Sequence, residues 1–285
     1  MPELPEVETI RRLVERHLVG RALETVEVRL PKLLRDSPFP SLDPLLGRSI
    51  TGARRRAKIL IVDWSGDLSL LVHFKLSGQL AIEHAGTDRV VAGHPVPDPH
   101  GPYPHRATHV IFGFAGGNTV YFSDVRQFGW LRLMPTARAE EVVESFGFGP
   151  EAVGHDSIEL HDMAARLARR RIAIKTALLN QQVMAGLGNI YVDEALHRAA
   201  IHPGRPANLL RPAELVRLHA AISWSLERGI EQGGAKIVHN RAYPKDGFPQ
   251  VHGRAGEPCV TCSAPITKIR VGARGTYFCH RCQPA

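Results

Sequence analysis

The placement of four cysteines near the C-terminus most constrains how this 285-residue chain can fold. They form two pairs, Cys259-x-x-Cys262 and Cys279-x-x-Cys282, with sixteen residues between the pairs. This spacing matches the template for a zinc site with four thiolate ligands. A redox pair or two disulfides are the alternatives, which a reducing cytosol and the presence of two identical CxxC pairs together disfavour. We expect one structural zinc ion, because four thiolates close the tetrahedral shell and leave no position for water or substrate.

The segment that carries these cysteines is strongly basic. Lys268, Arg270 and Arg274 lie between the two pairs, and acidic residues are few in this region. We predict a small β-hairpin that carries these cations toward phosphates. Taken alone, the segment also fits a zinc ribbon that contacts another protein.

The net charge and the apolar runs narrow the class of protein. Lysine and arginine number 36 against 28 acidic residues, and a formal charge of +8 favours a polyanionic partner. The longest apolar stretches, such as 68–74, are strand-sized and far below the roughly 20 residues that span a bilayer. The N-terminus has no basic stretch leading into an apolar run, so we expect no secretory signal. We therefore predict a cytoplasmic chain with reduced thiols and no membrane association.

The first part of the chain reads as a helix followed by strands. Val7, Ile10, Val14 and Leu18 recur at helical spacing, which predicts a helix over 5–19. Alternating or apolar runs predict strands at 23–30, 59–62, 68–74, 108–114 and 119–123. We expect these strands to form an antiparallel domain that ends near Leu133. Residues 84–106, rich in His, Pro and Gly, predict a long surface loop to which no function is assigned.

The second part is helical up to a glycine pair at 233–234. Helical patterns occupy 137–145, 161–182, 190–199 and 212–232. The predicted domains are thus 1–133, 134–234 and 235–285. Within the helical part, Gly186-Leu187-Gly188-Asn189 allows a tight reversal that presents backbone N–H groups to an anion. A plain helix-hairpin turn is the alternative, and the turn by itself favours it.

The N-terminus offers a nucleophile. Removal of Met1 would expose the secondary amine of Pro2, next to the carboxylates of Glu3 and Glu6. An α-amino group titrates near 8 and lysine near 10.4, so the terminal amine has a larger reactive fraction at neutral pH. Condensation with a sugar C1′ would give an iminium that serves as an electron sink. Considered by itself, the same start fits an ordinary processed terminus.

Taken together, these motifs resemble the formamidopyrimidine-DNA glycosylase and endonuclease VIII family. The resemblance spans essentially the whole chain. It rests on PELPEVETIRR at 2–12, RRRAK at 54–58, HFKLSG at 73–78, DVRQFG at 124–129, AGLGNIYVDEAL at 185–196 and the terminal cysteine pairs. The PELPE start places the chain nearer the formamidopyrimidine-DNA glycosylase branch.

The resemblance implies an α+β multidomain fold. An N-terminal antiparallel β-sandwich with a flanking helix would be joined to a helix-two-turns-helix domain and a four-cysteine zinc finger. The implied activity is that of a bifunctional DNA glycosylase and AP lyase of base excision repair. Such an enzyme would excise oxidised or ring-opened purines, such as 8-oxoguanine and formamidopyrimidines, through a Schiff base on the N-terminal proline. β,δ-Elimination would then cleave the strand. Specificity for oxidised pyrimidines, as in endonuclease VIII, and a non-catalytic module that binds damaged DNA are the alternatives.

The resemblance also assigns roles to residues. Pro2 would be the nucleophile, Glu3 the catalytic acid and Lys58 a lysine that contacts a phosphate near the lesion. The other expected phosphate contacts are His73, Lys175, Asn189, His252 and Arg274. Leu76, Arg126 and Phe128 would fill the void that the flipped nucleotide leaves. The expected partner is damaged double-stranded DNA, bound by a monomer in a bacterial-type cytoplasm in association with the nucleoid.

The chain departs from the family pattern in three places. His252 stands where the family has a phosphate-contacting tyrosine, and Lys75 replaces a usual glycine. The stretch 234–251, which would carry a loop over the damaged base, is shorter than in members that close over 8-oxoguanine. These departures leave the preferred base open between oxidised purines and other lesions.

Overall fold

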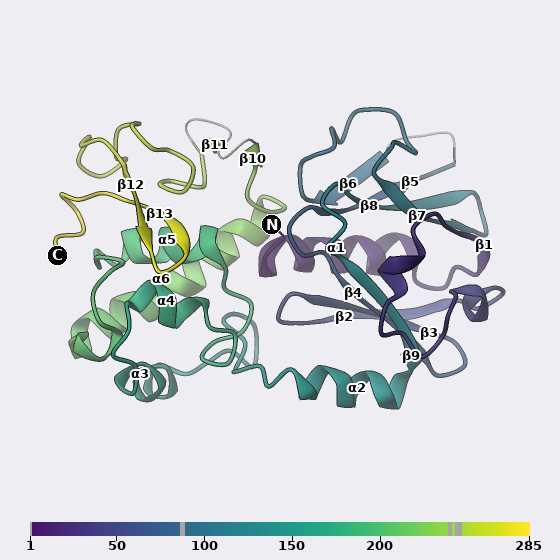
Figure 1. The fold of residues 1–285 in the computed structure, drawn as a ribbon, viewed down its shortest axis with the longest axis horizontal. Helices are drawn as coiled ribbons and strands as arrows, with labels where there is room; N and C mark the ends of the chain where they lie inside the picture. The colour runs from purple at the N-terminus through teal and green to yellow at the C-terminus, as the bar shows by residue number, and fades with distance from the viewer. Residues whose placement is uncertain (1, 86–88, 239–240, 243–246) are drawn as a thin grey trace. The chain divides into compact units, whose positions relative to one another are not determined.

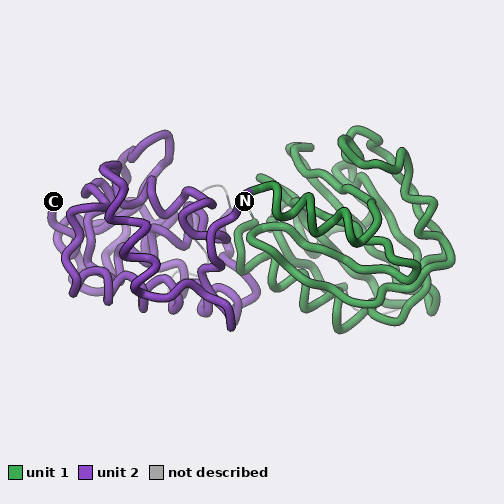
Figure 2. The backbone as a smooth tube through the Cα atoms, turned by 90° about the horizontal axis from the view of Figure 1, so that it is seen from below, with its two compact units in different colours: residues 1–146 green, residues 147–285 purple. Residues whose placement is uncertain are grey.

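The computed structural model describes residues 2–85, 89–238, 241–242 and 247–285. The chain forms two compact units, residues 1–146 and 147–285, here called unit 1 and unit 2 (Figure 2). The three-part division into 1–133, 134–234 and 235–285 stays a prediction. The predicted removal of Met1 lies outside the described residues, as do residues 239–240 and 243–246 of the predicted shortened stretch 234–251.

Unit 1 consists of helix α1, two antiparallel sheets and the short helix α2 (Figure 1). The four-stranded sheet has the order β2 (Ile50–Arg56), β3 (Ile59–Trp64), β4 (Leu68–His73) and β9 (Trp130–Pro135). The five-stranded sheet has the order β1 (Leu23–Val28), β7 (Thr108–Phe114), β8 (Asn118–Asp124), β5 (Gly78–Glu83) and β6 (Arg89–Gly93). The helices are α1 (Leu4–Leu18), η1 (Pro31–Leu34), η2 (Asp43–Leu45) and α2 (Thr136–Ser145). The predicted antiparallel sandwich with a flanking helix is confirmed.

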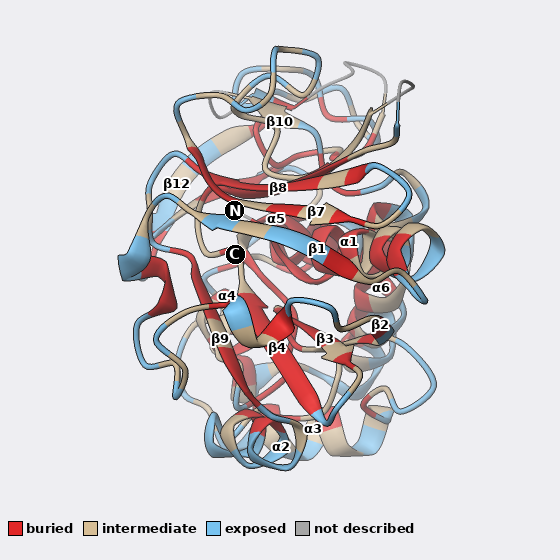
Figure 3. Ribbon diagram, turned by 90° about the vertical axis from the view of Figure 1, so that its right-hand side faces the viewer, coloured by how far each residue is buried: buried red, intermediate tan, exposed pale blue. Residues whose placement is uncertain are grey.

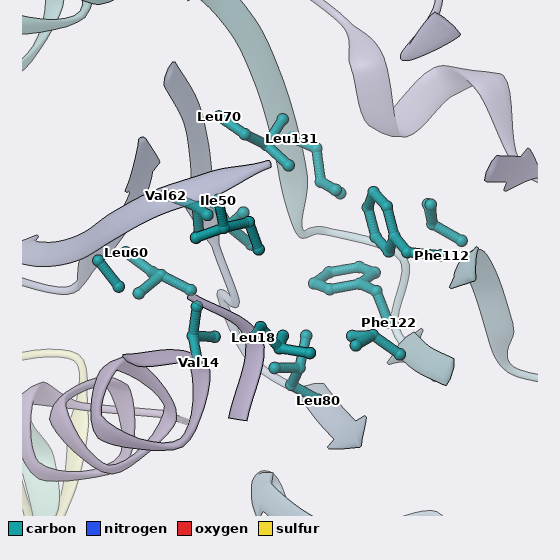
Figure 4. Close-up of a cluster of buried hydrophobic side chains, with 14 of the residues drawn as sticks. Val14, Leu18, Ile50, Leu60, Val62, Leu70, Leu80, Phe112, Phe122 and Leu131 are labelled. Atoms are coloured by element: carbon teal, nitrogen blue, oxygen red, sulfur yellow. The ribbon is translucent and has the colours of Figure 1, made fainter. Parts of the chain in front are cut away.

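The core of unit 1 lies where the two sheets and α1 meet. Val14 and Leu18 of α1 pack with Leu60 and Leu70 of one sheet and with Phe122 of the other (Figure 4). All are at most 3% exposed, because the helical spacing of α1 and the alternation of the strands point them inward. Figure 3 shows the same contrast along the strands, with β8 largely buried and the edge strand β1 exposed along much of its length.

Two predicted elements are wrong. The predicted loop 84–106 contains strand β6, which pairs with β5 from Gln79–Gly93 to Glu83–Arg89. The predicted helix 161–182 is broken into α3 (Leu160–Ala168) and α4 (Ile174–Leu179). The break follows from tertiary pairing, because Ala207 donates its N–H to the carbonyl of Ile172 at 2.9 Å. The backbone between the two helices is therefore satisfied outside a helix.

Unit 2 packs helices against a small C-terminal hairpin. After α3 and α4 come α5 (Asn189–Arg198), η3 (Ala207–Leu209), α6 (Pro212–Glu231), β10 (Ile237–Val238), β11 (Arg241–Ala242), β12 (Thr267–Val271) and β13 (Arg274–Phe278). Helix α5 lies against both α6 and β13. Strands β12 and β13 form the predicted hairpin, which is confirmed. Among the residues that the structure describes, no helix combines the length and apolar character needed to cross a membrane.

The N-terminus of α6 makes stability depend on pH. Glu214 accepts the backbone N–H of Arg211 at 2.8 Å and an N–H of Arg205 at 2.6 Å. Hydrogen bonds from the side chains of Arg205 and then Arg211, followed by the backbone N–H of Arg211, lower the pKa of Glu214 from 4.5 to about 2. A carboxyl whose pKa is lower in the folded state stabilises the protein above its ordinary pKa, and this contribution fades as pH falls toward the folded value.

We expect Glu214→Gln to lower the free energy of unfolding at pH 7 by about 1 kcal/mol, the usual size of a lost helix cap. The difference from the native protein should shrink between pH 5 and pH 2, as native Glu214 takes up its proton. Urea unfolding at a series of pH values measures it. The control is Glu231→Gln at the other end of α6, whose exposed ion pair with Arg228 contributes little. A gap that stays constant down to pH 2 would contradict the assignment.

Candidate functional site

The N-terminus of α1 places Pro2 and Glu3 in a fixed, buried position. Both residues are buried, and Glu3 is only 1% exposed. Glu3 donates its backbone N–H to Glu6 Oε2 at 2.8 Å, as part of a capping box at the start of the helix. Glu6 therefore satisfies the helix terminus. The two residues predicted to carry the chemistry are thus ordered by the helix that follows them.

Lys58 lies on the tight β2–β3 turn, which α1 holds in place. Ala57 in this turn has a φ of 52°, and its carbonyl accepts an N–H from Arg55 at 2.8 Å. The Arg55 guanidinium also lies 3.4 Å from Glu8 Oε2 of α1. Next along the chain from Lys58, Ile59 pairs with His73 across the sheet. Lys58 and His73 therefore occupy the same end of neighbouring strands.

The environment of His73 fixes its protonation. Burial, followed by the positive charges of Lys75, Lys58 and Arg132, lowers the pKa of His73 to about 3. The ring is therefore neutral at physiological pH. Its Nδ1 accepts the backbone N–H of Lys75 at 3.0 Å, so the proton of the neutral ring resides on Nε2. The neutral His73 ring is therefore a hydrogen-bond donor at Nε2.

Asp124 joins two loops at the end of the five-stranded sheet. It is fully buried and accepts the Ser77 hydroxyl, the Arg126 N–H at 3.1 Å and the Gly129 N–H at 2.7 Å. Ser77 Oγ in turn accepts the same Arg126 N–H at 2.8 Å. The loop after β4, which carries Leu76, and the loop after β8 are thus held by one carboxylate.

The loop after β8 presents an aromatic ring to solvent. Phe128 is 46% exposed, and the guanidinium carbon of Arg126 lies 5.3 Å from the centre of its ring. Leu76, on the other loop, is half-buried. Val125 of the same loop is 48% exposed, so this anchored loop carries two apolar side chains on the surface.

In unit 2, a buried ion pair connects the predicted phosphate-binding residues. Lys175 is fully enclosed, with Nζ 2.7 Å from Asp193 Oδ1 and 3.1 Å from the Gly275 carbonyl. Asn189 donates its side-chain N–H to the same carbonyl at 3.0 Å. Arg274, the residue before Gly275, is exposed at the start of β13. Lys175 and Asn189 therefore hold the strand that presents Arg274.

His252 is held by the same helix, α5. Its Nδ1 lies 2.7 Å from Asp193 Oδ2, which also accepts the Tyr277 N–H at 3.1 Å. The next residue, Glu194, accepts the N–H of His252 at 2.8 Å and those of the two residues before it. Burial raises the pKa of Glu194, against the lowering by these N–H donors. Among the described residues, Nδ1 is the ring nitrogen of His252 that a side-chain partner engages.

The four cysteines converge as their spacing predicts. Their sulfur atoms all lie within 4.8 Å of one another, with Cys259–Cys282 at 3.8 Å and Cys262–Cys279 at 3.5 Å. Zinc–sulfur bonds of about 2.3 Å in a tetrahedron require sulfur–sulfur separations of about 3.8 Å, so the ligands fit the ion. The pKa of Cys262 is lowered to about 7, first by the backbone N–H of Ala264. Burial, in contrast, raises the pKa values of Cys279 and Cys282.

Comparison with known proteins places the whole chain in one family. Residues 1–131 match the formamidopyrimidine-DNA glycosylase N-terminal domain, 148–240 its H2TH domain, and 256–285 a zinc finger found in FPG and IleRS. The formamidopyrimidine-DNA glycosylases of Streptococcus mutans and Herpetosiphon aurantiacus are 36% and 39% identical. Each alignment covers 99% of this chain and at least 99% of the relative. The chain belongs to the formamidopyrimidine-DNA glycosylase family.

Solved structures of this family have the same fold. A Lactococcus lactis Fpg bound to DNA containing N7-benzyl-Fapy-dG aligns with a TM-score of 0.85 and 33% identity, covering all of both chains. A second complex of that Fpg, with DNA containing an abasic site, aligns with a TM-score of 0.85 at 32% identity. The predicted fold class is confirmed, including the helix-two-turns-helix domain. The four-cysteine finger binds a structural zinc ion.

Sequence reasoning missed the residues that support the formamidopyrimidine-DNA glycosylase motifs. Asp124 and Ser77 hold the two loops of unit 1, and Asp193 and Glu194 hold His252 and β13 in unit 2. Each of these four residues lies inside a sequence motif in which DNA-binding roles were predicted for neighbouring residues instead. The available signal was an acidic residue at the end of an apolar strand, or on a helix beside apolar neighbours, where burial demands a hydrogen-bonding role.

The structure also explains the glycine that the family usually has at position 75. Lys75 has a φ of 48°, in the left-handed region that costs a non-glycine residue about 1 kcal/mol. Burial, followed by Arg35 and Arg132, also lowers the pKa of Lys75, so its charge is poorly accommodated. We expect Lys75→Gly to raise the free energy of unfolding by about 0.5–1 kcal/mol, measured by urea unfolding. Lys75→Ala removes the charge but keeps the strain, and should gain less. Equal gains in both variants would contradict the backbone argument.

Proposed function

We propose that Pro2 is the nucleophile of this protein, which is a DNA glycosylase of base excision repair with lyase activity. The observation that carries the proposal is the buried, helix-anchored Pro2–Glu3 terminus in a chain of this family. Removal of Met1 is part of the proposal, because the lone pair of an amide nitrogen is delocalised into the carbonyl and is not nucleophilic.

The chemistry starts with attack of the Pro2 nitrogen on C1′ of the damaged nucleotide. The bond between C1′ and the base breaks, and the base leaves with a proton. The nitrogen loses its proton, the C1′–O4′ bond breaks, and Glu3 is proposed as the acid that gives O4′ a proton as the sugar ring opens. The resulting iminium draws electrons from the C2′–H bond, so that C2′ loses a proton and the 3′ phosphate leaves. A second elimination releases the 5′ phosphate, which gives β,δ-elimination.

The remaining predicted residues are proposed to bind DNA. Lys58 and His73 in unit 1 would contact phosphates near the lesion, and the Nε2–H of His73 has the donor character for this. In unit 2, exposed Arg274 and the outer nitrogen of His252 would contact phosphates directly. Enclosed Lys175 and Asn189 are placed to orient these two residues. A phosphate reaching Lys175 would have to displace one of its present partners.

Leu76, Arg126 and Phe128 are proposed to fill the void in the duplex after the damaged nucleotide flips out. The exposed ring of Phe128 can replace lost stacking, and the Arg126 guanidinium can bond the unpaired base. Asp124 would keep both loops in register during insertion. These roles are supported by the exposure of Phe128 and Arg126 on an anchored loop.

Oxidised or ring-opened purines are the proposed substrates, in line with the names of the relatives. Endonuclease VIII-like action on oxidised pyrimidines is the competing specificity, motivated by the shortened stretch after Gly234. We also propose that the protein acts as a monomer on damaged double-stranded DNA. Its place of action would be a bacterial-type cytoplasm, in association with the nucleoid and without membrane contact.

Borohydride trapping tests the proposed function. Duplexes that carry 8-oxoguanine, a formamidopyrimidine, an oxidised pyrimidine or an abasic site would be incubated with the protein and borohydride. Hydride transfer to the iminium carbon converts it to a stable amine. We expect a covalent adduct that peptide mass analysis locates at Pro2. Binding of damaged DNA without adduct or strand cleavage would indicate the non-catalytic module. The ranking of the bases decides between purine and pyrimidine specificity.

A further inference from the structure

A histidine outside the cysteine motif contacts the zinc site. His197 of α5 is 5% exposed, and its Nε2 lies 3.3 Å from Sγ of Cys259, which is itself 2% exposed. The distance is within hydrogen-bonding range for a sulfur partner. The contact joins residues 62 positions apart, so it links the helix that carries Asn189 and Asp193 to the finger.

We propose that His197 donates a hydrogen bond from Nε2 to the zinc-bound Cys259 thiolate and so positions and stabilises the metal site. A zinc-bound thiolate has no proton, so the sulfur accepts and the ring nitrogen donates. Four thiolates around one Zn²⁺ carry a net charge of −2. In a buried setting, N–H donors are the groups that can stabilise this charge. His197 adds to the backbone N–H of Thr261, which lies 3.4 Å from the same sulfur.

The hydrogen bond from His197 also connects the zinc site to residues proposed to take part in DNA binding. Helix α5 places Asn189 and Asp193 against β13, and His197 lies one turn beyond Asp193 on that helix. A second connection exists at Gln283, which bonds the Cys279 N–H at 2.9 Å and the Ile201 carbonyl at 2.8 Å. The zinc site is thus tied to α5 and to the segment just after it, rather than being self-contained.

The test compares three variants of the full-length protein. His197→Phe keeps a ring but removes the donor, and His197→Gln keeps an N–H at a similar reach. His202→Phe is the matched control, because the His202 ring packs on Phe278 of β13 at 5.0 Å without contacting a cysteine. Zinc affinity is measured by competition with a chromophoric chelator. We expect His197→Phe to raise the zinc dissociation constant by about 10- to 100-fold. The other two variants should stay near the native value.

Cobalt substitution provides a second readout that a packing role would not move. A hydrogen bond stabilises the filled sulfur orbitals, so its loss should shift the sulfur-to-cobalt charge-transfer band of His197→Phe to longer wavelength. His197→Gln and His202→Phe should keep the native band. An unshifted band in His197→Phe, or a zinc affinity equally weak in both His197 variants, would overturn the proposal. If His197→Phe does not fold, His197→Gln decides the question, because a shifted band there refutes donation.

Discussion

Extension of the chain by Gly-Ser ahead of Pro2 is expected to lower the rate of base excision by about 10³-fold or more. The extension converts the proline nitrogen into an amide, whose lone pair is delocalised and cannot attack C1′. The borohydride adduct should vanish with it. Single-turnover cleavage of lesion DNA measures the rate, and intact mass confirms that the extension is retained. DNA affinity should change much less than the rate, because the phosphate contacts proposed in unit 2 lie far along the chain.

The matched control for this experiment carries the same Gly-Ser after Ala285 and should cleave at the native rate. Pro2→Gly provides an intermediate case. Its primary amine condenses to a neutral imine, which must gain a proton before it withdraws electrons, so the adduct should form in reduced yield. Full trapping of the N-terminally extended protein would exclude Pro2 and point to a lysine nucleophile.

Loss of zinc is expected to weaken binding to lesion DNA by about 100-fold or more, because structural zinc supplies much of the folding free energy of a small domain. Cys259→Ser or chelation should disorder the β12–β13 hairpin, which carries Lys268, Arg270 and Arg274. Those cations then no longer present a fixed surface to phosphates. Fluorescence anisotropy with a labelled duplex at fixed salt measures the affinity.

Unit 1 should survive the loss of zinc. Trp64 and Trp130 belong to unit 1 and are 3% and 4% exposed, so their emission reports on its core. In a Trp224→Phe background, no other tryptophan contributes. Emission should therefore remain native after Cys259→Ser. Val260→Ser, at a 61% exposed position beside the ligand, is the control and should bind DNA normally. Unchanged affinity after verified zinc removal would contradict the role of the finger.

The local sequence pattern predicted most helices and strands. It could not predict where hydrogen bonds to distant segments break a helix or create a strand. The region 161–182 has a continuous helical pattern, and no proline or glycine interrupts it. The helix nevertheless breaks, because the segment between Arg170 and Ile174 exchanges backbone hydrogen bonds with residues 205–208. Strand β6 was missed for a similar reason. Its residues are only partly buried, and its strand character depends on β5 as a partner.

The site shows the same limit. The motifs identified the residues expected to touch DNA. They did not identify the buried carboxylates that hydrogen-bond to several of those residues. Sequence reasoning gave Lys175 a direct phosphate contact, yet its ammonium is enclosed by Asp193. Its assignment as a direct phosphate ligand stays a prediction. The roles of Asp124 and Asp193 depend on which loops converge on them, and no spacing in the chain encodes that convergence.

The sequence by itself determined the zinc ligands, the basic finger, the α1 helix and the family. These depend on short spacings and local periodicity, which act within a few residues. Only the tertiary structure decided that Asp124 holds both loops of unit 1, that His73 carries its proton on Nε2, and that His197 reaches the zinc site. The physical reason is that buried polar groups must find hydrogen-bond partners wherever folding brings them. Some of those partners lie far away along the chain, as Ser77 does from Asp124 and Cys259 from His197.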